Sequence, residues 1–416
     1  MKLQCTQEDL AKGLSIASRA VATRHVLPVL GNVMLSAEDE SRLKLSATNL
    51  EISISCWVNA RVEEKGAITV PARLLSDLVN SLPPERIDME LVERTQTLNL
   101  KCARFEANVK GIAAEEFPLI PSITGDYQMT NSLAPGRVAF LPGEREGERV
   151  CQVSLEPELL REMIRQVTIA AATDESRPIL TGVLTKFEGQ SLTLVAADGF
   201  RLSVRTAELV EPVPEPLSVI IPARAFQEIS RIASEEEEPI TLIIAPDRNQ
   251  AFFKATGVEL ISQLIEGTYP NYGSVIPNSH TTRTVVNTKE FFDALKVAFS
   301  FARDRANLVR LQVVPGGELT PGQITIMAAS AESGDNVGEI DGVVEGAKSK
   351  IALNARYLMQ ALAVVGTEQV ALEMTTPNAP LALKPVGGGN FTHIIMPMAI
   401  VDEEEEETSD SQPNAG

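Results

Sequence analysis

The sequence is poor in aromatic, histidine and cysteine residues. Aromatic side chains make up 4% of the 416 residues, which disfavours a surface that binds unpaired bases mainly by stacking. The three histidines have no histidine partner at helical spacing, so the sequence does not indicate a helical metal site. The four cysteines contain no close-spaced pair, and we expect buried free thiols rather than zinc ligands or a redox pair.

Long apolar runs and excess positive charge are also missing. No stretch approaches the roughly 18 apolar residues that a membrane span needs, and residues 1–13 lack the apolar core of a signal peptide. We therefore expect a cytoplasmic protein. The 56 acidic residues against 37 basic ones give a net charge of -19, which excludes a protein held on nucleic acid by its overall field.

A four-residue string occurs three times, as Val70-Pro71-Ala72-Arg73, Ile221-Pro222-Ala223-Arg224 and Leu353-Asn354-Ala355-Arg356. Apolar residues at helical spacing follow each copy. An alternating strand with a small polar turn precedes each copy, at residues 43–49, 192–199 and 324–330, and an amphipathic helix lies further upstream, at about 8–22, 157–171 and 288–302. The repeated unit is therefore predicted to be strand, helix, several strands, helix, several strands.

This repeat predicts an α+β fold of three similar domains, over residues 1–125, 150–278 and 282–400. The interval from Arg73 to Arg224 exceeds that from Arg224 to Arg356 by 19 residues, so the first interval contains an insertion. Residues 122–150 are rich in Pro, Gly, Ser and Thr, and we expect an extended linker over residues 126–149. Residues 401–416 begin with a run of acids and lack branched apolar residues apart from Val401, which predicts a disordered tail.

The basic residues follow the predicted helices. Removing the seven acids of residues 402–416 leaves a net charge of -12 on the rest of the chain. Helical spacing places Lys12 with Arg19, Arg161 with Arg165, and Lys289 with Lys296 and Arg303 on single stripes, while Arg73, Arg224 and Arg356 open the later helices. Solubilising charge would explain one such helix. The recurrence of basic residues on helices of all three copies favours a basic track that contacts the phosphates of duplex nucleic acid without sequence preference.

No group of residues supports catalysis. Asp198 has neither a histidine nor a second carboxylate in its motif, so we expect a turn residue. The triplet Gly387-Gly388-Gly389 lacks the Lys-Ser/Thr of a phosphate loop and is expected to connect two strands. We expect a solvated loop at residues 235–238. These expectations indicate a non-catalytic protein without cofactor or metal, either a DNA-binding track or a tandem-repeat interaction scaffold without nucleic acid.

Six segments together resemble a known family: residues 1–10, 24–35, the first four-residue string, 197–202, 269–272 and 396–398. In this order they resemble the bacterial DNA polymerase III beta subunit, the sliding clamp, and the resemblance covers residues 1–400. It implies a ring-shaped, head-to-tail homodimer with helices lining the hole and sheets outside. Such a ring encircles duplex DNA and serves replication as a processivity factor.

The resemblance also implies binding residues. The DNA-facing positions are Lys12, Arg24, Arg73, Arg177 and Arg224, and the charge stripes alone add Arg161, Arg165, Lys296 and Arg356.

A pocket for short linear peptides of the replicative polymerase, the clamp loader and repair proteins is also implied. Its positions are Leu180, Ala197, Gly199, Phe200, Arg201, Leu202, Pro270, Val275, Asn354, Tyr357, Ile394, Met396, Pro397 and Met398. Ala197 and Phe200 stand where the family commonly has threonine and histidine. Without the resemblance, residues 394–398 are better interpreted as a last core strand.

Overall fold

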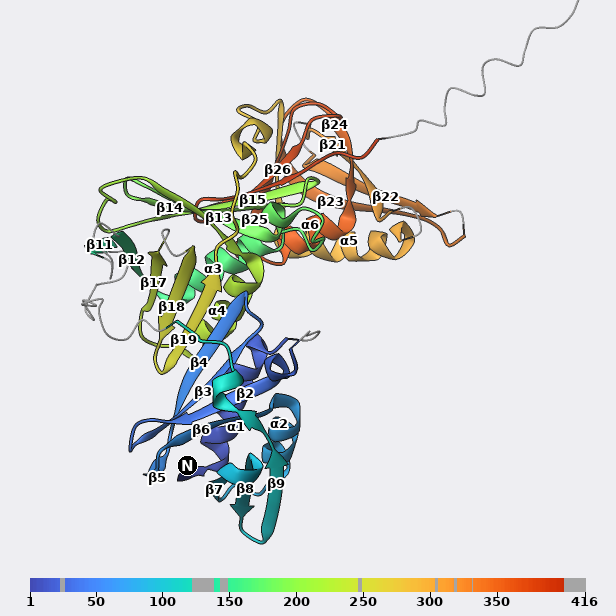
Figure 1. Ribbon diagram of the computed structural model, residues 1–416. Coiled ribbons are helices and arrows are strands. Elements are labelled where there is room, and N and C mark those ends of the chain that lie inside the picture. Colours follow the sequence, from blue (N-terminus) through green and yellow to red (C-terminus); the bar gives the residue numbers. More distant parts are fainter. Residues whose placement is uncertain are drawn as a thin grey trace, which may run out of the picture. The chain divides into compact units, whose positions relative to one another are not determined.

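The computed structural model describes residues 1–22, 27–121, 138–142, 149–245, 249–303, 306–317, 320–330 and 332–399. These residues form two compact units. The first contains Met1–Thr168, Asp174–Leu194 and Ala207–Tyr269, and the second contains Ile169–Thr173, Val195–Thr206 and the chain from Pro270 onward. The boundary between the units divides two neighbouring strands, which Figure 1 labels β14 (Ser191–Ala197) and β15 (Arg201–Glu208). It falls between Leu194 and Val195 in the first and between Thr206 and Ala207 in the second.

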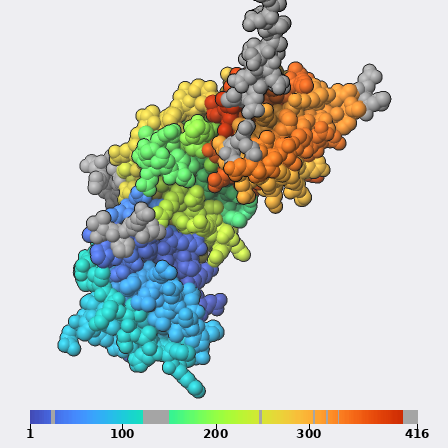
Figure 2. All heavy atoms as spheres, turned by 90° about the vertical axis from the view of Figure 1, so that its right-hand side faces the viewer, coloured from blue at the N-terminus to red at the C-terminus, as the bar shows by residue number. Residues whose placement is uncertain are grey.

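The predicted order of elements is confirmed in all three copies of the repeat. The first copy consists of β1 (Lys2–Thr6), α1 (Gln7–Ala17), β2 (Asn32–Ala37), β3 (Arg42–Thr48), β4 (Ile52–Asn59), β6 (Gly66–Pro71), α2 (Ala72–Ser81), β7 (Arg86–Val92), β8 (Thr97–Cys102) and β9 (Phe105–Lys110). The short strands β5 (Arg61–Glu64) and β10 (Ile112–Ala113) are additions to this copy. Its residues gather in one body, blue to cyan in Figure 2.

The second copy consists of β12 (Arg149–Leu155), α3 (Pro157–Thr168), β13 (Gly182–Glu188), β14 (Ser191–Ala197), β15 (Arg201–Glu208), β16 (Leu217–Pro222), α4 (Ala223–Ile232), β17 (Ile240–Ala245), β18 (Gln250–Ala255) and β19 (Val258–Gln263). The third consists of β20 (Thr282–Asn287), α5 (Thr288–Ala302), β21 (Leu308–Val314), β22 (Gly322–Ser330), β23 (Gly334–Gly346), β24 (Ser349–Asn354), α6 (Ala355–Leu362), β25 (Gln369–Met374), β26 (Leu381–Pro385) and β27 (Phe391–Ile395).

The repeated string forms the junction between a strand and a helix. In each copy the strand ends at the second residue of the string and the helix begins at the alanine. That alanine is buried in all three copies, so the following arginine, about 100° further round the helix, points to solvent. In the third copy Asn354 also caps α6, because its Oδ1 accepts a hydrogen bond from the backbone N–H of Arg356 at 3.0 Å.

One ten-stranded sheet runs through the first unit, in the order β10-β6-β2-β3-β4-β19-β18-β17-β12-β11. The first and second copies meet where β4 pairs with β19 in antiparallel register, with Ile54 opposite Leu260. The helices α1 and α2 pack against each other, and so do α3 and α4. The first copy contributes a second, five-stranded sheet in the order β5-β1-β7-β8-β9, in which β9 is an edge.

The helices of these two copies cover the same face of the ten-stranded sheet. The Cα of Gly13 in α1 approaches Cys56 of β4 so closely that a Cβ there would lie 3.6 Å from its Sγ. In α4, the Phe226 ring packs edge to face on Phe253 of β18, with 5.6 Å between ring centroids. Residues directly opposite each other in a sheet share a face, and Phe253 lies opposite Leu260 while Cys56 lies opposite Val258. Leu260 and Val258 are two residues apart on β19 and also share a face, so α1 and α4 contact the same side of the sheet.

The predicted linker over residues 126–149 is wrong for one stretch. Residues Val138–Pro142 form β11, which pairs antiparallel with β12 and extends the ten-stranded sheet. An unpaired β12 would leave a row of backbone donors and acceptors at the sheet edge, and β11 satisfies them. The rest of the insertion and the predicted acidic tail lie outside the described residues.

The second unit contains β15, β27, β26, β25, β20, β23, β22, β21 and β24, in this order of pairing. The second and third copies meet where β15 pairs with β27. Helices α5 and α6 pack together over a core that includes Phe291, Leu295 and Leu358. Asn287 caps α5 by accepting hydrogen bonds from the backbone N–H groups of Lys289 and Glu290.

The remaining predictions concern cysteines and membrane spans. All four cysteines are buried and free, as expected. Burial raises the pKa of the Cys5, Cys56 and Cys151 thiols to about 12, so these three stay protonated and unreactive at neutral pH. No helix among the described residues is both long and apolar enough to cross a membrane.

Candidate DNA and peptide sites

The predicted DNA-facing residues of the first unit that the structure describes are all exposed. The Arg73 side chain is 96% exposed, and its Nε lies 3.9 Å from the Asp77 carboxylate, which is a loose contact. Arg224 is exposed and donates a hydrogen bond to the Arg19 carbonyl oxygen at 3.3 Å. Arg177 is also exposed and precedes the turn Pro178–Thr181. Arg24 lies outside the described residues.

Lys12 differs from these arginines because its acidic partner is close enough for a hydrogen bond. Its Nζ lies 2.9 Å from the Glu235 carboxylate, and both side chains are more than half exposed. The hydrogen bond with Glu235 raises the pKa of Lys12 and lowers the pKa of Glu235. The segment 235–238, expected to be only a solvated loop, therefore supplies a carboxylate that competes with phosphate for Lys12.

The second unit carries exposed bases on α5 and α6. Lys289 and Lys296 lie on the face of α5 opposite its buried residues, as their spacing predicts. Lys289 pairs with Asp293 at 2.8 Å. Lys296 and the Arg356 side chain are exposed and make no ion pair within the described part of the chain.

The turn between β14 and β15 contains two of the predicted peptide-pocket residues, Gly199 and Phe200. Gly199 has a φ of 93°, a conformation that favours glycine. Asp198, a turn residue as expected, accepts hydrogen bonds from the backbone N–H groups of Phe200 and Arg201 at 2.9 and 3.0 Å. The turn leaves the Phe200 side chain 59% exposed. It is therefore one of the large apolar side chains most available to a ligand.

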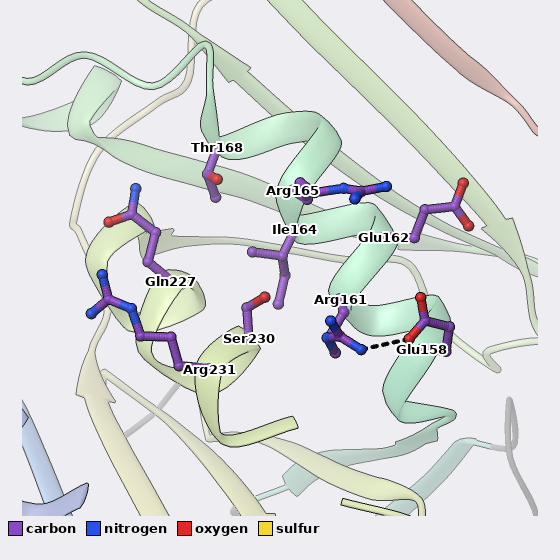
Figure 3. A pocket seen from close by; sticks show the side chains of 9 residues that line it. All are labelled: Glu158, Arg161, Glu162, Ile164, Arg165, Thr168, Gln227, Ser230 and Arg231. Carbon is purple, nitrogen blue, oxygen red and sulfur yellow. Dashed lines mark hydrogen bonds and ion pairs between the residues drawn. The ribbon is translucent and has the colours of Figure 1, made fainter. Parts of the chain in front are cut away.

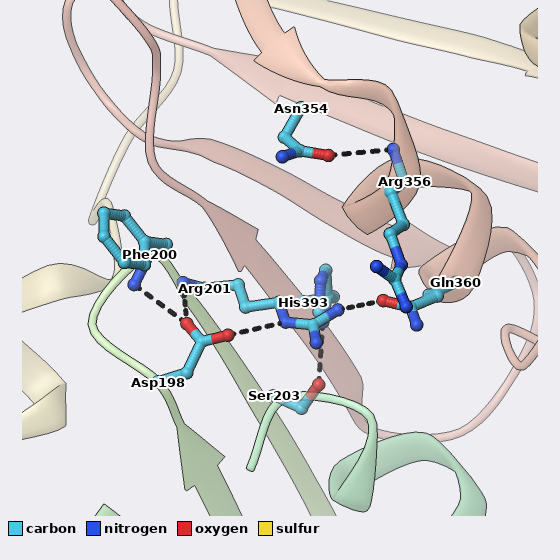
Figure 4. A network of polar contacts seen from close by, with 8 residues as sticks. All are labelled: Asp198, Phe200, Arg201, Ser203, Asn354, Arg356, Gln360 and His393. Atoms are coloured by element: carbon cyan, nitrogen blue, oxygen red, sulfur yellow. Dashed lines mark hydrogen bonds and ion pairs between the residues drawn. The ribbon is translucent and has the colours of Figure 1, made fainter. Parts of the chain in front are cut away.

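Arg201 is held by three side chains, of which Figure 4 shows Asp198 and Gln360. Its Nε donates to the Asp198 carboxylate at 3.0 Å, one terminal nitrogen donates to the Gln360 side-chain oxygen, and its guanidinium lies 4.2 Å from the centre of the Tyr357 ring. These contacts connect β15 to α6. They hold the Arg201 guanidinium in one position.

The end of β27 lies beside this turn. The backbone N–H of Met396 donates to the Phe200 carbonyl oxygen at 2.8 Å, and that of Met398 donates to Ala352 at 2.9 Å. The Met396 side chain is 38% exposed and Val275 is 37% exposed, whereas Ile394 is fully buried. Residues 391–395 are thus a core strand, and the exposed methionine follows it.

The other predicted pocket positions vary in exposure. Leu202 is buried and pairs with Ile394, so both underlie the surface. Ala197, Asn354, Tyr357, Pro397 and Met398 are half-buried, and Pro270 is exposed. Leu180 is half-buried and belongs to the first unit, in the turn Pro178–Thr181.

Sequence reasoning missed a buried polar pair beneath this surface. His393 of β27 is fully buried, and its Nδ1 lies 2.7 Å from the Ser203 hydroxyl of β15. Its Nε2 has no hydrogen-bond partner among the described residues. Burial, and to a smaller extent the Arg201 charge, lowers the pKa of His393 from 6.5 to about 3. The alternation of Phe391, His393 and Ile395 on one face was the available signal.

The described residues contain no group of three or more potential metal ligands. The exposed basic helices and the half-buried apolar surface instead suit two kinds of macromolecular contact. Family models for the N-terminal, central and C-terminal domains of the DNA polymerase III beta subunit match residues 1–121, 154–271 and 273–399.

The chain belongs to the DNA polymerase III beta-subunit family. It is 31% identical over 423 residues to the "Beta sliding clamp" of Synechocystis, covering 97% of this chain and 100% of the relative. Membership confirms the predicted DNA sliding clamp, a non-catalytic processivity subunit of DNA replication, over the interaction scaffold without DNA.

Solved clamp structures share the fold over the whole chain. The clamp of Bacillus subtilis has 28% sequence identity and a TM-score of 0.83, covering 96% of this chain and 99% of that one. The Pseudomonas aeruginosa clamp bound to griselimycin has 26% identity and a TM-score of 0.82, covering 96% and 100%. The predicted domain limits and site residues remain predictions.

The buried His393 makes stability depend on acid. Between the unfolded pKa of 6.5 and the folded value of about 3, the unfolded chain binds a proton that the folded chain does not. The free energy of unfolding therefore decreases as the pH is lowered through this window. This group contributes a decrease of up to about 1.4 kcal/mol per pH unit. In urea titrations between pH 6.5 and 4.5, His393→Leu should show the shallower slope. Equal slopes in the variant and in wild type would refute the assignment.

Proposed function

We propose that two copies of this chain close into a ring around duplex DNA, with the helices facing the DNA and the sheets facing outward. The observation that carries this proposal is the shared face of α1 and α4 on one continuous sheet, which directs the bases of two successive copies to the same side. The third copy repeats the same elements. A cytoplasmic location fits this role.

The proposed DNA contacts are Lys12, Arg24, Arg73, Arg177 and Arg224. Isolated surface arginines bind phosphates weakly and without sequence preference. A closed ring does not need strong contacts, because the DNA cannot leave without ring opening or a free end. Weak contacts also let the ring slide, which a processivity factor requires.

The proposed ring closure uses strand edges that remain after the copies have paired within one chain. The last strand of the second copy pairs with β4, and the last strand of the third copy pairs with β15. In each case the last strand of one copy pairs with the third strand after the first helix of the preceding copy. In the third copy that strand is β23, and the last strand of the first copy is β9. We therefore propose that β9 of one chain pairs with β23 of a second chain. Among the described residues, β9 pairs only with β8, and residues 335–341 of β23 pair only with β22.

Exposed apolar side chains lie on both of these strands. Phe105 of β9 and Val337 of β23 are each 59% exposed. An exposed strand edge with large apolar residues is a ready site for another strand. Pairing β9 with β23 gives a head-to-tail dimer, in agreement with the homodimer that the family implies.

The peptide site is proposed on the surface formed by Phe200, Arg201, Tyr357, Met396 and Val275. Phe200 and Met396 offer exposed apolar area, and Arg201 adds a guanidinium whose position is fixed. Methionine adapts to differently shaped partners, which suits a surface shared by a polymerase, a loader and repair proteins.

Encirclement predicts that DNA topology controls retention. A clamp loaded on a nicked circle by its loader should remain bound at high salt, because topology rather than charge holds it there. Cutting the circle should release it. Gel filtration before and after linearisation measures both states, with a circle lacking the cut site as control. Equal salt-driven loss from circle and line would contradict encirclement.

The strand-edge proposal predicts a dimerisation defect in Val337→Asp. A carboxylate at the centre of the joined edge would have to be desolvated, so the dimer should weaken about tenfold or more, or ~1.4 kcal/mol. Val210→Asp is the matched control, because Val210 is 58% exposed and lies outside both strands. Sedimentation velocity at several concentrations measures the dimer. Identical behaviour of the two variants would refute the proposed edge.

The peptide proposal predicts that Met396→Ala combined with Met398→Ala weakens binding of a synthetic peptide from the replicative polymerase. Loss of this apolar contact should reduce affinity about tenfold, or ~1.4 kcal/mol, while the dimer remains intact. Calorimetry measures the affinity, and Val210→Ala provides an exposed apolar control. Unchanged affinity in the double variant would place the peptide elsewhere.

A further inference from the structure

A groove between α3 and α4 in the first unit has no assigned role. Its cavity volume is about 270 Å³, and it is lined by residues of both helices (Figure 3). Ile164 of α3 and Ser230 of α4 face each other between the helices, with Arg161, Arg165 and Arg231 around them. Pockets for drug-sized ligands usually enclose roughly 300–1,000 Å³. This groove suits a smaller chemical group.

The three arginines of the groove are not equivalent. Arg161 pairs with Glu158 at 2.7 Å, and Arg231 pairs with Glu228 at 2.7 Å. Arg165 is exposed and makes no ion pair or side-chain hydrogen bond with any residue that the structure describes. Its guanidinium is therefore the lining cation that remains available to an added anion.

Neutral donors accompany Arg165. The side chains of Thr168, Gln227 and Ser230 line the groove, and within the described ranges none of them has a side-chain partner. With Arg165, the lining therefore offers two hydroxyl groups, one amide and one planar guanidinium. This combination suits an anion with several acceptor oxygens.

One acid opposes this preference. Glu162 also lines the groove, and its Oε1 accepts a hydrogen bond from Gln166 at 3.1 Å. An anion held by Arg165 would be repelled by this carboxylate. Any anion in the groove would therefore be bound weakly, and substitution of Glu162 should have the opposite effect to substitution of Arg165.

We propose that the groove between α3 and α4 holds a phosphodiester group of the encircled duplex, through Arg165 assisted by Thr168, Gln227 and Ser230. The inference rests on the proposed encirclement of DNA. The lining contains no aromatic residue, so the groove holds backbone rather than stacked bases. Its donors contact phosphate oxygens, which carry no sequence information.

The test measures binding of each variant to a fluorescent 30-base-pair duplex by anisotropy at several salt concentrations. Losing one phosphate contact reduces the salt slope by about 0.9, equivalent to about eightfold weaker binding at 0.1 M salt. Arg165→Ala should show both changes, and Arg165→Lys should partly restore the slope. Ser230→Ala should weaken binding without changing the slope, because it removes a neutral donor.

Two further variants complete the comparison. Glu162→Gln removes a repulsive charge and should tighten binding. Arg61→Ala removes an exposed arginine of β5, on the five-stranded sheet, and should bind like wild type. Thermal melting verifies that each variant is folded. Indistinguishable binding by Arg165→Ala and Arg61→Ala would overturn the groove assignment.

The outcomes separate this inference from the proposal on which it rests. If wild type is also lost equally from circular and linear DNA, encirclement fails and the groove assignment fails with it. If wild type is retained on circles but Arg165→Ala keeps the wild-type salt slope, only the groove assignment fails. Inorganic phosphate is the second probe in calorimetry. Phosphate binding that Arg165→Ala abolishes, without any change in duplex binding, would identify a site for a free anion and overturn the DNA assignment.

Discussion

Consecutive copies of the repeat are joined by antiparallel backbone pairing between the last strand of one copy and a middle strand of the copy before it. This happens at β19 with β4 and again at β27 with β15. Because side chains alternate across a strand, the β4–β19 register decides which face of the joined sheet each helix pair covers. A slip of one residue would move one helix pair to the opposite face and separate the bases of the two copies.

The same pairing rule explains why the first and third copies each keep an unpaired strand edge to which a second chain could bind. The second copy uses both its last strand and its middle strand, whereas the first copy has no predecessor and the third has no successor. The strands left over are β9 and part of β23, and each carries a large exposed apolar side chain. Exposed strand edges are an aggregation hazard in a monomer. Their occurrence at both ends of the repeat is consistent with a closed assembly of two chains.

Much of this architecture could be predicted from the sequence because the repeat marks positions with strong local requirements. The string around Arg73, Arg224 and Arg356 marks three strand-to-helix junctions, where a buried alanine fixes the outward direction of the arginine. Spacing likewise located the exposed stripe of α5. The insertion was harder to interpret, because β11 is short and forms only by pairing with β12, a tertiary interaction that composition does not reveal.

Side-chain partners across elements were beyond sequence reasoning. Nothing in the sequence joins Lys12 to Glu235, Ser203 to His393, or Arg201 to Gln360, because these residues are far apart along the chain and meet only through the sheet register. The groove at α3 and α4 was missed for the same reason. Arg165 was identified from its helix stripe, but the neutral donors beside it come from both helices.

The pairing of bases with nearby acids has a consequence for sliding. A ring that follows DNA must exchange phosphate contacts continually, so each contact has to be weak and replaceable. Lys12, Arg161 and Lys289 each have a carboxylate at 2.7 to 2.9 Å that can take the place of a departing phosphate. This intramolecular competitor lowers the free-energy difference between bound and unbound states of the lysine or arginine. Exposed pairs of this kind are worth only about 0–1 kcal/mol, so they reduce the grip without abolishing it. The acidic balance of the chain is thus compatible with DNA contact at the helices.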